Sequence, residues 1–85
     1  MRVIATLLTT AHCSLCDQAK EILGRLEHEQ AVAVEIIDVH SVTGQELAAR
    51  SGMAFPPALL LDGEPFSYGR LSERKLRREL ARRRG

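Results

Sequence analysis

Cysteine, aromatic side chains and long hydrophobic runs are all scarce in this sequence. Only two cysteines are present, too few for the several disulfide bonds that hold small secreted domains together. The first apolar run, Val3 to Leu8, is interrupted by Thr6 and is too short for a membrane span or for the apolar region of a signal peptide. These absences argue against a secreted disulfide-rich module and a membrane protein, and they favour the cytoplasm.

What remains is the composition of an ordinary globular protein. Hydrophobic residues make up 45% and charged residues 27% of the 85 residues, and there is no low-complexity segment, internal repeat or linker. A chain of this length has room for one small core. We therefore expect residues 1–85 to form a single domain, and we expect it to act as a monomer.

Positive charge is concentrated at the C-terminal end of the chain. The net charge is +1, yet residues 70–85 hold eight of the twelve Lys and Arg residues. Such a basic helix can act as a docking module for nucleic acid or another anionic surface. The competing interpretation is that these cations complement the helix dipole and keep the chain end soluble. No aromatic or base-reading motif accompanies the charge, so a nucleic-acid partner is not expected.

Hydrophobic periodicity predicts seven elements in the order β-α-β-α-β-β-α. Strands are expected at residues 3–8, 32–38, 58–61 and 64–68, with helices from residue 13, from residue 43 and after residue 72. Thr43 and Glu46 have the spacing of a capping box for the second helix, and Gly52 is expected to end that helix in a left-handed conformation. Ser72 is expected to cap the last helix.

This order of elements predicts an α/β fold. Two successive strand–helix–strand units predict a parallel core joined by right-handed crossovers. The dipeptide Asp62-Gly63 predicts a tight turn and an antiparallel strand after it, which Pro65 restricts to a sheet edge because proline cannot donate to the ladder. The expected fold is a mixed four-stranded sheet with helices on both faces.

Cys13 and Cys16 lie three positions apart, where the first strand passes into the first helix. This spacing puts both side chains on one helix face, so a disulfide between them can form and should be easy to reduce. If Cys13 occupies the first helical position, unpaired N–H groups and the helix dipole lower its thiol pKa. Cys16 lies one turn further on, on the same helix face as the apolar residues Ala19, Leu23 and Leu26. We expect Cys13 to attack a disulfide and Cys16 to resolve the resulting mixed disulfide.

Two other interpretations of the cysteine pair remain open. Free cysteines are often packed in cores as small apolar residues, which suits Cys16 but not Cys13 in its polar loop. Two thiolates can also hold a soft metal ion, copper or zinc. A structural zinc site needs four ligands, however, and only three scattered histidines accompany the pair. No resident metal is expected, and soft-metal handling stays an alternative to redox chemistry.

Two motifs, H-C-S-L-C-D at residues 12–17 and P-A-L-L-L-D-G at residues 57–63, together with the element order resemble the thioredoxin fold and its minimal glutaredoxin-like members. The resemblance implies a thioredoxin-like oxidoreductase in which Cys13 and Cys16 are the catalytic dithiol. It implies that Pro57 is a cis proline packed against this pair, and that the residue before it pairs through its main chain with the substrate.

The same resemblance implies the partners of the reaction. The substrate would be a disulfide-bearing protein or a small thiol compound, and no cofactor would be bound. Electrons would come from glutathione, another low-molecular-weight thiol or a flavin-dependent reductase.

Two positions depart from the family pattern. The residue before Pro57 is Pro56, which has no N–H and so offers the substrate one main-chain hydrogen bond fewer. Glutathione-using members have a Gly-Gly turn and a nearby Asp before the last helix, where this chain has only Gly69. Gly69 and the start of the last helix can still bind a carboxylate with help from Arg70; alternatively, Gly69 is only a turn residue and Ser72 only a cap. Pro56, Pro57 and Gly69 are the predicted substrate-binding residues.

Overall fold

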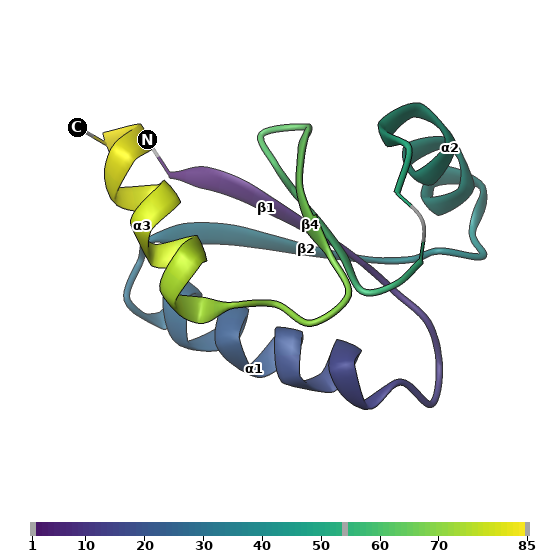
Figure 1. Ribbon diagram of the computed structural model, residues 1–85, viewed down its shortest axis with the longest axis horizontal. Coiled ribbons are helices and arrows are strands. Elements are labelled where there is room, and N and C mark those ends of the chain that lie inside the picture. Colours follow the sequence, from purple (N-terminus) through teal and green to yellow (C-terminus); the bar gives the residue numbers. More distant parts are fainter. Residues whose placement is uncertain (1, 54, 85) are drawn as a thin grey trace.

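The computed structural model describes residues 2–53 and 55–84. Its elements are β1 (Val3–Thr9), α1 (Ser14–His28), β2 (Val32–Asp38), α2 (Val42–Ser51), β3 (Ala58–Leu61), β4 (Glu64–Tyr68) and α3 (Glu73–Arg84). Figure 1 shows α1 and α3 close together and α2 apart from both. The predicted order of elements is confirmed. Over the described residues, no helix is long and apolar enough to cross a membrane.

The described strands form one four-stranded sheet in the order β2-β1-β3-β4. β1 and β2 are parallel, while β3 runs antiparallel to β1 and β4 antiparallel to β3. The mixed sheet and the edge position of β4 are therefore as predicted. The expected second parallel crossover is wrong, because β3 runs in the opposite direction to β1.

This reversal goes with the place where α2 (Val42–Ser51) packs. Leu47 and Ala48 of α2 pack against Leu8 and Ala58, at the C-terminal end of β1. The chain thus enters β3 from that end, and Ala58 pairs with Leu8.

The main core lies between the sheet and the helices α1 and α3. Leu7, Leu59 and Leu61 of the sheet are at most 1% exposed, and they pack with buried leucines of α1 and α3. Burying a leucine side chain contributes about 1.5–3 kcal/mol. Leu76 and Leu80 of α3 are both in this core. This packing holds α1, and with it the cysteine pair, on the sheet.

The start of α2 differs from the predicted capping box. Ser41 is the N-cap, and its hydroxyl accepts a hydrogen bond from Gly44 N–H at 3.0 Å while donating to the Asp38 carbonyl at 2.6 Å. The helix therefore begins before Thr43, because the serine hydroxyl links the end of β2 to the first helical turn. The predicted end is confirmed, since Gly52 is left-handed with a φ of 71°.

An ion-pair network joins α1 to α3. Arg77 contacts Glu29 at 2.8 Å and Glu73 at 2.9 Å, and Arg25 contacts Glu73 at 2.6 Å. Hydrogen bonds from these arginines lower the pKa of both glutamates. The network therefore uses part of the positive charge of α3 to hold the two helices together.

Two glycine-to-alanine substitutions should have opposite effects on stability. A Cβ at Gly44 would overlap the Asp38 carbonyl oxygen, whereas one at Gly24 meets nothing within 4 Å. Gly44→Ala should lower the free energy of unfolding by about 1–3 kcal/mol. Gly24→Ala should raise it by about 0.5–1 kcal/mol, because alanine favours a helix interior. Urea titrations of both variants test this, and equal effects would contradict the close packing at Gly44.

Acid should remove the stabilisation supplied by the α1–α3 network. Because the pKa values of Glu29 and Glu73 are lowered in the folded state, their contribution is present above the ordinary glutamate value of 4.5 and is lost as the pH falls through the lowered values. Glu29→Gln/Glu73→Gln should therefore be less stable than the wild type at neutral pH and equally stable in strong acid. Glu46→Gln, at an exposed position of α2, is the control, and a pH-independent difference would contradict the prediction.

Candidate functional site

The cysteine pair lies at the end of β1, where a short turn leads into α1. His12 has a left-handed φ of 54°, which redirects the chain between the strand and the helix. Cys13 is extended, with φ −124° and ψ 106°, and α1 begins at Ser14. Cys13 is thus the N-cap and not the first helical position that the sequence analysis assigned to it, which is Ser14. Its carbonyl accepts the first helical hydrogen bond, from Asp17 N–H at 3.1 Å.

The sulfur of Cys13 takes the place of a capping oxygen. It accepts a hydrogen bond from the main-chain N–H of Cys16 at 3.1 Å, the role that Ser, Thr, Asp or Asn usually fills at an N-cap. An N–H aimed at the sulfur, at the positive end of a helix, favours thiolate over thiol when the cysteine is reduced. The N-cap position therefore brings the Cys13 sulfur closer to the free N–H groups than a position inside the helix would.

The two cysteines differ in their access to solvent. They are joined as a disulfide, with Cα atoms 5.2 Å apart, within the range that this bond requires. Cys13 is partly exposed, whereas Cys16 is 1% exposed against the core. This difference is the one that attack by Cys13 and resolution by Cys16 require.

The predicted substrate-binding residues lie in two loops that contact each other. The Pro56–Pro57 peptide is cis, Pro57 is buried, and the Pro57 carbonyl accepts a hydrogen bond from Gly69 N–H at 2.8 Å. Because Ala58 pairs with Leu8, Pro57 lies at the end of the sheet from which β1 continues toward Cys13. The sheet therefore brings the proline loop and the cysteine turn to one end of its central strands.

Gly69 has a clear structural role at this place. Its φ is 81°, and a Cβ there would come within 3.4 Å of the Phe55 ring. Ser72 also acts as the cap that was one of the two interpretations, since its hydroxyl accepts a hydrogen bond from Lys75 N–H at 3.2 Å. Substrate binding by Gly69 remains a prediction beside this role.

An exposed aromatic pair next to these loops was not predicted. The rings of Phe55 and Tyr68 meet edge to face, with centroids 5.2 Å apart, and the two residues are 54% and 50% exposed. Exposed aromatic rings offer large apolar contact areas. The sequence held a signal for them, because two of its three aromatic residues directly precede the predicted positions Pro56 and Gly69.

Metal ligands do not gather around the cysteine pair. Within residues 2–53 and 55–84, no group of three or more His, Cys, Asp or Glu side chains could hold a metal ion. The soft-metal alternative therefore depends on two sulfurs alone.

Residues 4–81 match the family model described as Glutaredoxin-like domain (DUF836). The chain belongs to this family. Its curated relatives include uncharacterised proteins of Mycobacterium tuberculosis and Mycobacterium bovis, each 37% identical over 79 residues, which cover 89% of this chain and 80% of the relative.

Solved structures similar to this glutaredoxin-like chain include thioredoxins. A thioredoxin variant from Halobacterium salinarum NRC-1 has a TM-score of 0.76 and 26% identity, covering 94% of this chain and 73% of the other. Fasciola hepatica thioredoxin has a TM-score of 0.68 and 22% identity, with 95% and 80% covered, and shows the fold alone. The predicted thioredoxin-like fold and the glutaredoxin-like resemblance are confirmed.

Proposed function

We propose that this glutaredoxin-like chain is a small thiol–disulfide oxidoreductase in which Cys13 is the nucleophile and Cys16 the resolving thiol. The observation that carries the proposal is the N-cap geometry of α1. One sulfur is partly exposed and accepts a main-chain N–H, and its bonded partner is buried one turn further on. No bound cofactor is needed for the exchange.

The reaction consists of two sulfur exchanges. In the reduced protein, the Cys13 thiolate attacks one sulfur of the substrate disulfide, and the other sulfur leaves with the bonding electron pair and takes up a proton. Cys16 then loses its proton, and its thiolate attacks the Cys13 sulfur of the mixed disulfide. The second substrate thiol leaves, and the Cys13–Cys16 disulfide forms. Two electrons have then passed from the protein to the substrate.

The spent disulfide must be reduced again by another reactant. Glutathione, another low-molecular-weight thiol or a flavin-dependent reductase would supply the two electrons, and a disulfide-bearing protein or small disulfide would be the substrate. A reducing cytoplasm would keep this cycle turning in the direction of substrate reduction.

Substrate docking is proposed at the loops of Pro56, Pro57 and Gly69, where Pro57 and Gly69 are buried and Pro56 and the aromatic pair are accessible. Phe55 and Tyr68 provide exposed ring surface beside the two loops. The main chain at Pro56 has a carbonyl to offer but no N–H. Apolar contact with the rings would therefore supply much of the affinity that main-chain pairing supplies elsewhere in the superfamily.

Single-cysteine variants test the assigned roles. In Cys16→Ser, alkylation of Cys13 should follow an apparent pKa below the value of about 8.5 for a free cysteine. This variant should also accumulate a mixed disulfide with substrate, detectable by mass spectrometry. Cys13→Ser should lose all disulfide reduction, and its buried Cys16 should alkylate slowly. An ordinary pKa at Cys13, with no turnover by the wild type using glutathione or a thioredoxin reductase, would disprove the proposed function.

Replacing Pro56 should strengthen substrate binding. Pro56→Ala restores a main-chain N–H, and one hydrogen bond contributes about 0.5–1.5 kcal/mol, equivalent to roughly a two- to tenfold lower KM for a disulfide-containing peptide. The kcat should not change. Pro65→Ala, on the edge strand β4, is the control and should leave KM unaltered. An unchanged KM in Pro56→Ala would show that the substrate does not pair with this main chain.

A further inference from the structure

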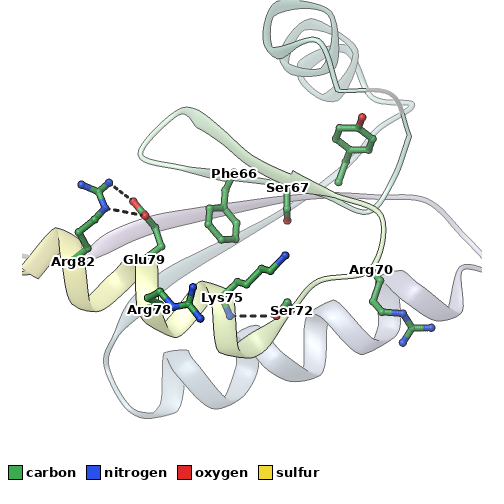
Figure 2. A pocket seen from close by; sticks show the side chains of 9 residues that line it. Phe66, Ser67, Arg70, Ser72, Lys75, Arg78, Glu79 and Arg82 are labelled. Atoms are coloured by element: carbon green, nitrogen blue, oxygen red, sulfur yellow. Dashed lines mark hydrogen bonds and ion pairs between the residues drawn. The ribbon is translucent and has the colours of Figure 1, made fainter.

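A groove of about 510 Å³ lies between β4 and α3. Figure 2 shows Phe66 and Ser67 along its β4 side, with Lys75, Arg78 and Arg82 on the α3 side. Arg70 lies at the end of the groove where the chain passes from β4 toward α3. The groove is separate from the loops assigned to substrate docking, apart from the shared residue Tyr68.

Three of the four cations that line this groove have no acidic partner among the described residues. Glu79, the one acidic residue in its lining, contacts Arg82 at 2.6 Å and Arg83 at 2.8 Å. Arg70, Lys75 and Arg78 form no ion pair among the described residues. The groove therefore carries an excess of three positive charges, and it favours an anionic occupant.

A β-bulge shapes the wall formed by β4. Leu59 pairs with Ser67 and Leu60 with Pro65, so Phe66 is the extra residue that pairs with neither. Phe66 packs against the main core on the α3 side, and its neighbour Ser67 also lines the groove. Phe66 and Ser67, two consecutive β4 residues, thus both line the groove opposite the cations of α3.

The groove runs between the edge strand β4 and the helix α3. Its α3 side runs from Ser72 to Arg82, about 15 Å of helix, which matches four to five residues of extended chain at about 3.3 Å each. β4 is an edge strand, so among residues 2–53 and 55–84 one side of its main chain has no partner strand. Unpaired strand edges bind extended peptides through main-chain hydrogen bonds.

The cations also have the spacing that such a peptide requires. Lys75, Arg78 and Arg82 follow one another at intervals of three and four residues, so they form one row with a repeat of about 5–6 Å. Alternate side chains of an extended peptide repeat every 6–7 Å or so. Long, flexible lysine and arginine side chains can bridge that small difference.

We propose that this groove binds an extended acidic segment of the protein whose disulfide the cysteine pair reduces. The position of Arg70 links the groove to the redox pair, because its guanidinium is 3.4 Å from the side-chain oxygen of Gln18, two residues after Cys16. A bound acidic segment would thus lie alongside the first turns of α1. This proposal rests on the proposed function for the identity of the partner, but peptide binding itself needs neither cysteine.

Fluorescence anisotropy tests the binding step in the redox-inactive variant Cys13→Ser/Cys16→Ser. The probe is a short labelled peptide with Glu at every second position, compared with the same peptide carrying Gln. In this background, Lys75→Gln/Arg78→Gln should weaken binding of the Glu peptide by about tenfold. Arg74→Gln/Arg84→Gln is the matched control, because it removes the same charge from exposed α3 positions outside the groove, and it should change binding less than twofold or so.

Three results would overturn the proposal. Equal losses in the groove variant and the control would show only a response to net charge, and equal binding of the Glu and Gln peptides would show no charge recognition. Binding of labelled oligothymidine through Lys75 and Arg78, without binding of the Glu peptide, would assign the groove to nucleic acid instead.

A kinetic measurement separates this proposal from the proposed function. With both cysteines present, Lys75→Gln/Arg78→Gln should raise the KM for a Glu-rich disulfide peptide by about tenfold while kcat and the KM for a neutral disulfide stay unchanged. If the wild type reduces no disulfide at all, the proposed function fails. In that case the anisotropy measurement still decides whether the groove binds acidic peptide.

Discussion

The proposed redox chemistry depends on the hydrogen bond from the Cys16 main chain to the Cys13 sulfur. That bond exists only because α1 begins at Ser14, which makes Cys13 the N-cap and aims a free N–H of the helix at the sulfur. The position of α1 in turn depends on its buried stripe, which packs against the sheet. The packing of α1 on the sheet thus sets the surroundings of the Cys13 sulfur. The same helix buries Cys16.

The antiparallel pairing of β1 with β3 gives this cysteine pair its neighbours. Had β3 been parallel, its first residues would lie at the opposite end of β1, far from the turn that carries Cys13. In the observed sheet, Ala58 pairs with Leu8 and the cis Pro57 lies at the cysteine end. The hydrogen bond from Gly69 to Pro57 then brings the end of β4 to the same place. The packing of α2 at the C-terminal end of β1, from which the chain enters β3, therefore accompanies the assembly of the proposed docking surface.

The cations of α3 fall into two groups with different surroundings. Arg77 joins α3 to α1 through Glu29 and Glu73, and Arg83 contacts acids of α3 and the β3–β4 hairpin. Lys75 and Arg78 face an open groove and have no acidic partner among the described residues. Net charge alone could not separate these groups. A strongly basic helix can serve stability along one side and recognition along the other.

The sequence by itself determined the elements, the Asp62-Gly63 turn, the edge position of β4 and the close pairing of the cysteines. These features depend on signals a few residues apart, such as hydrophobic periodicity, Gly52 at a helix end and the missing N–H of Pro65. Only the tertiary structure decided the direction of β3, the Ser41 cap that binds the end of β2, the contact of Gly69 with Pro57 and the groove beside α3. Each of these joins residues from different elements or depends on a backbone carbonyl that no side-chain pattern reveals. Local periodicity shows which face of an element is apolar. The direction of a strand depends instead on where elements distant in the sequence pack.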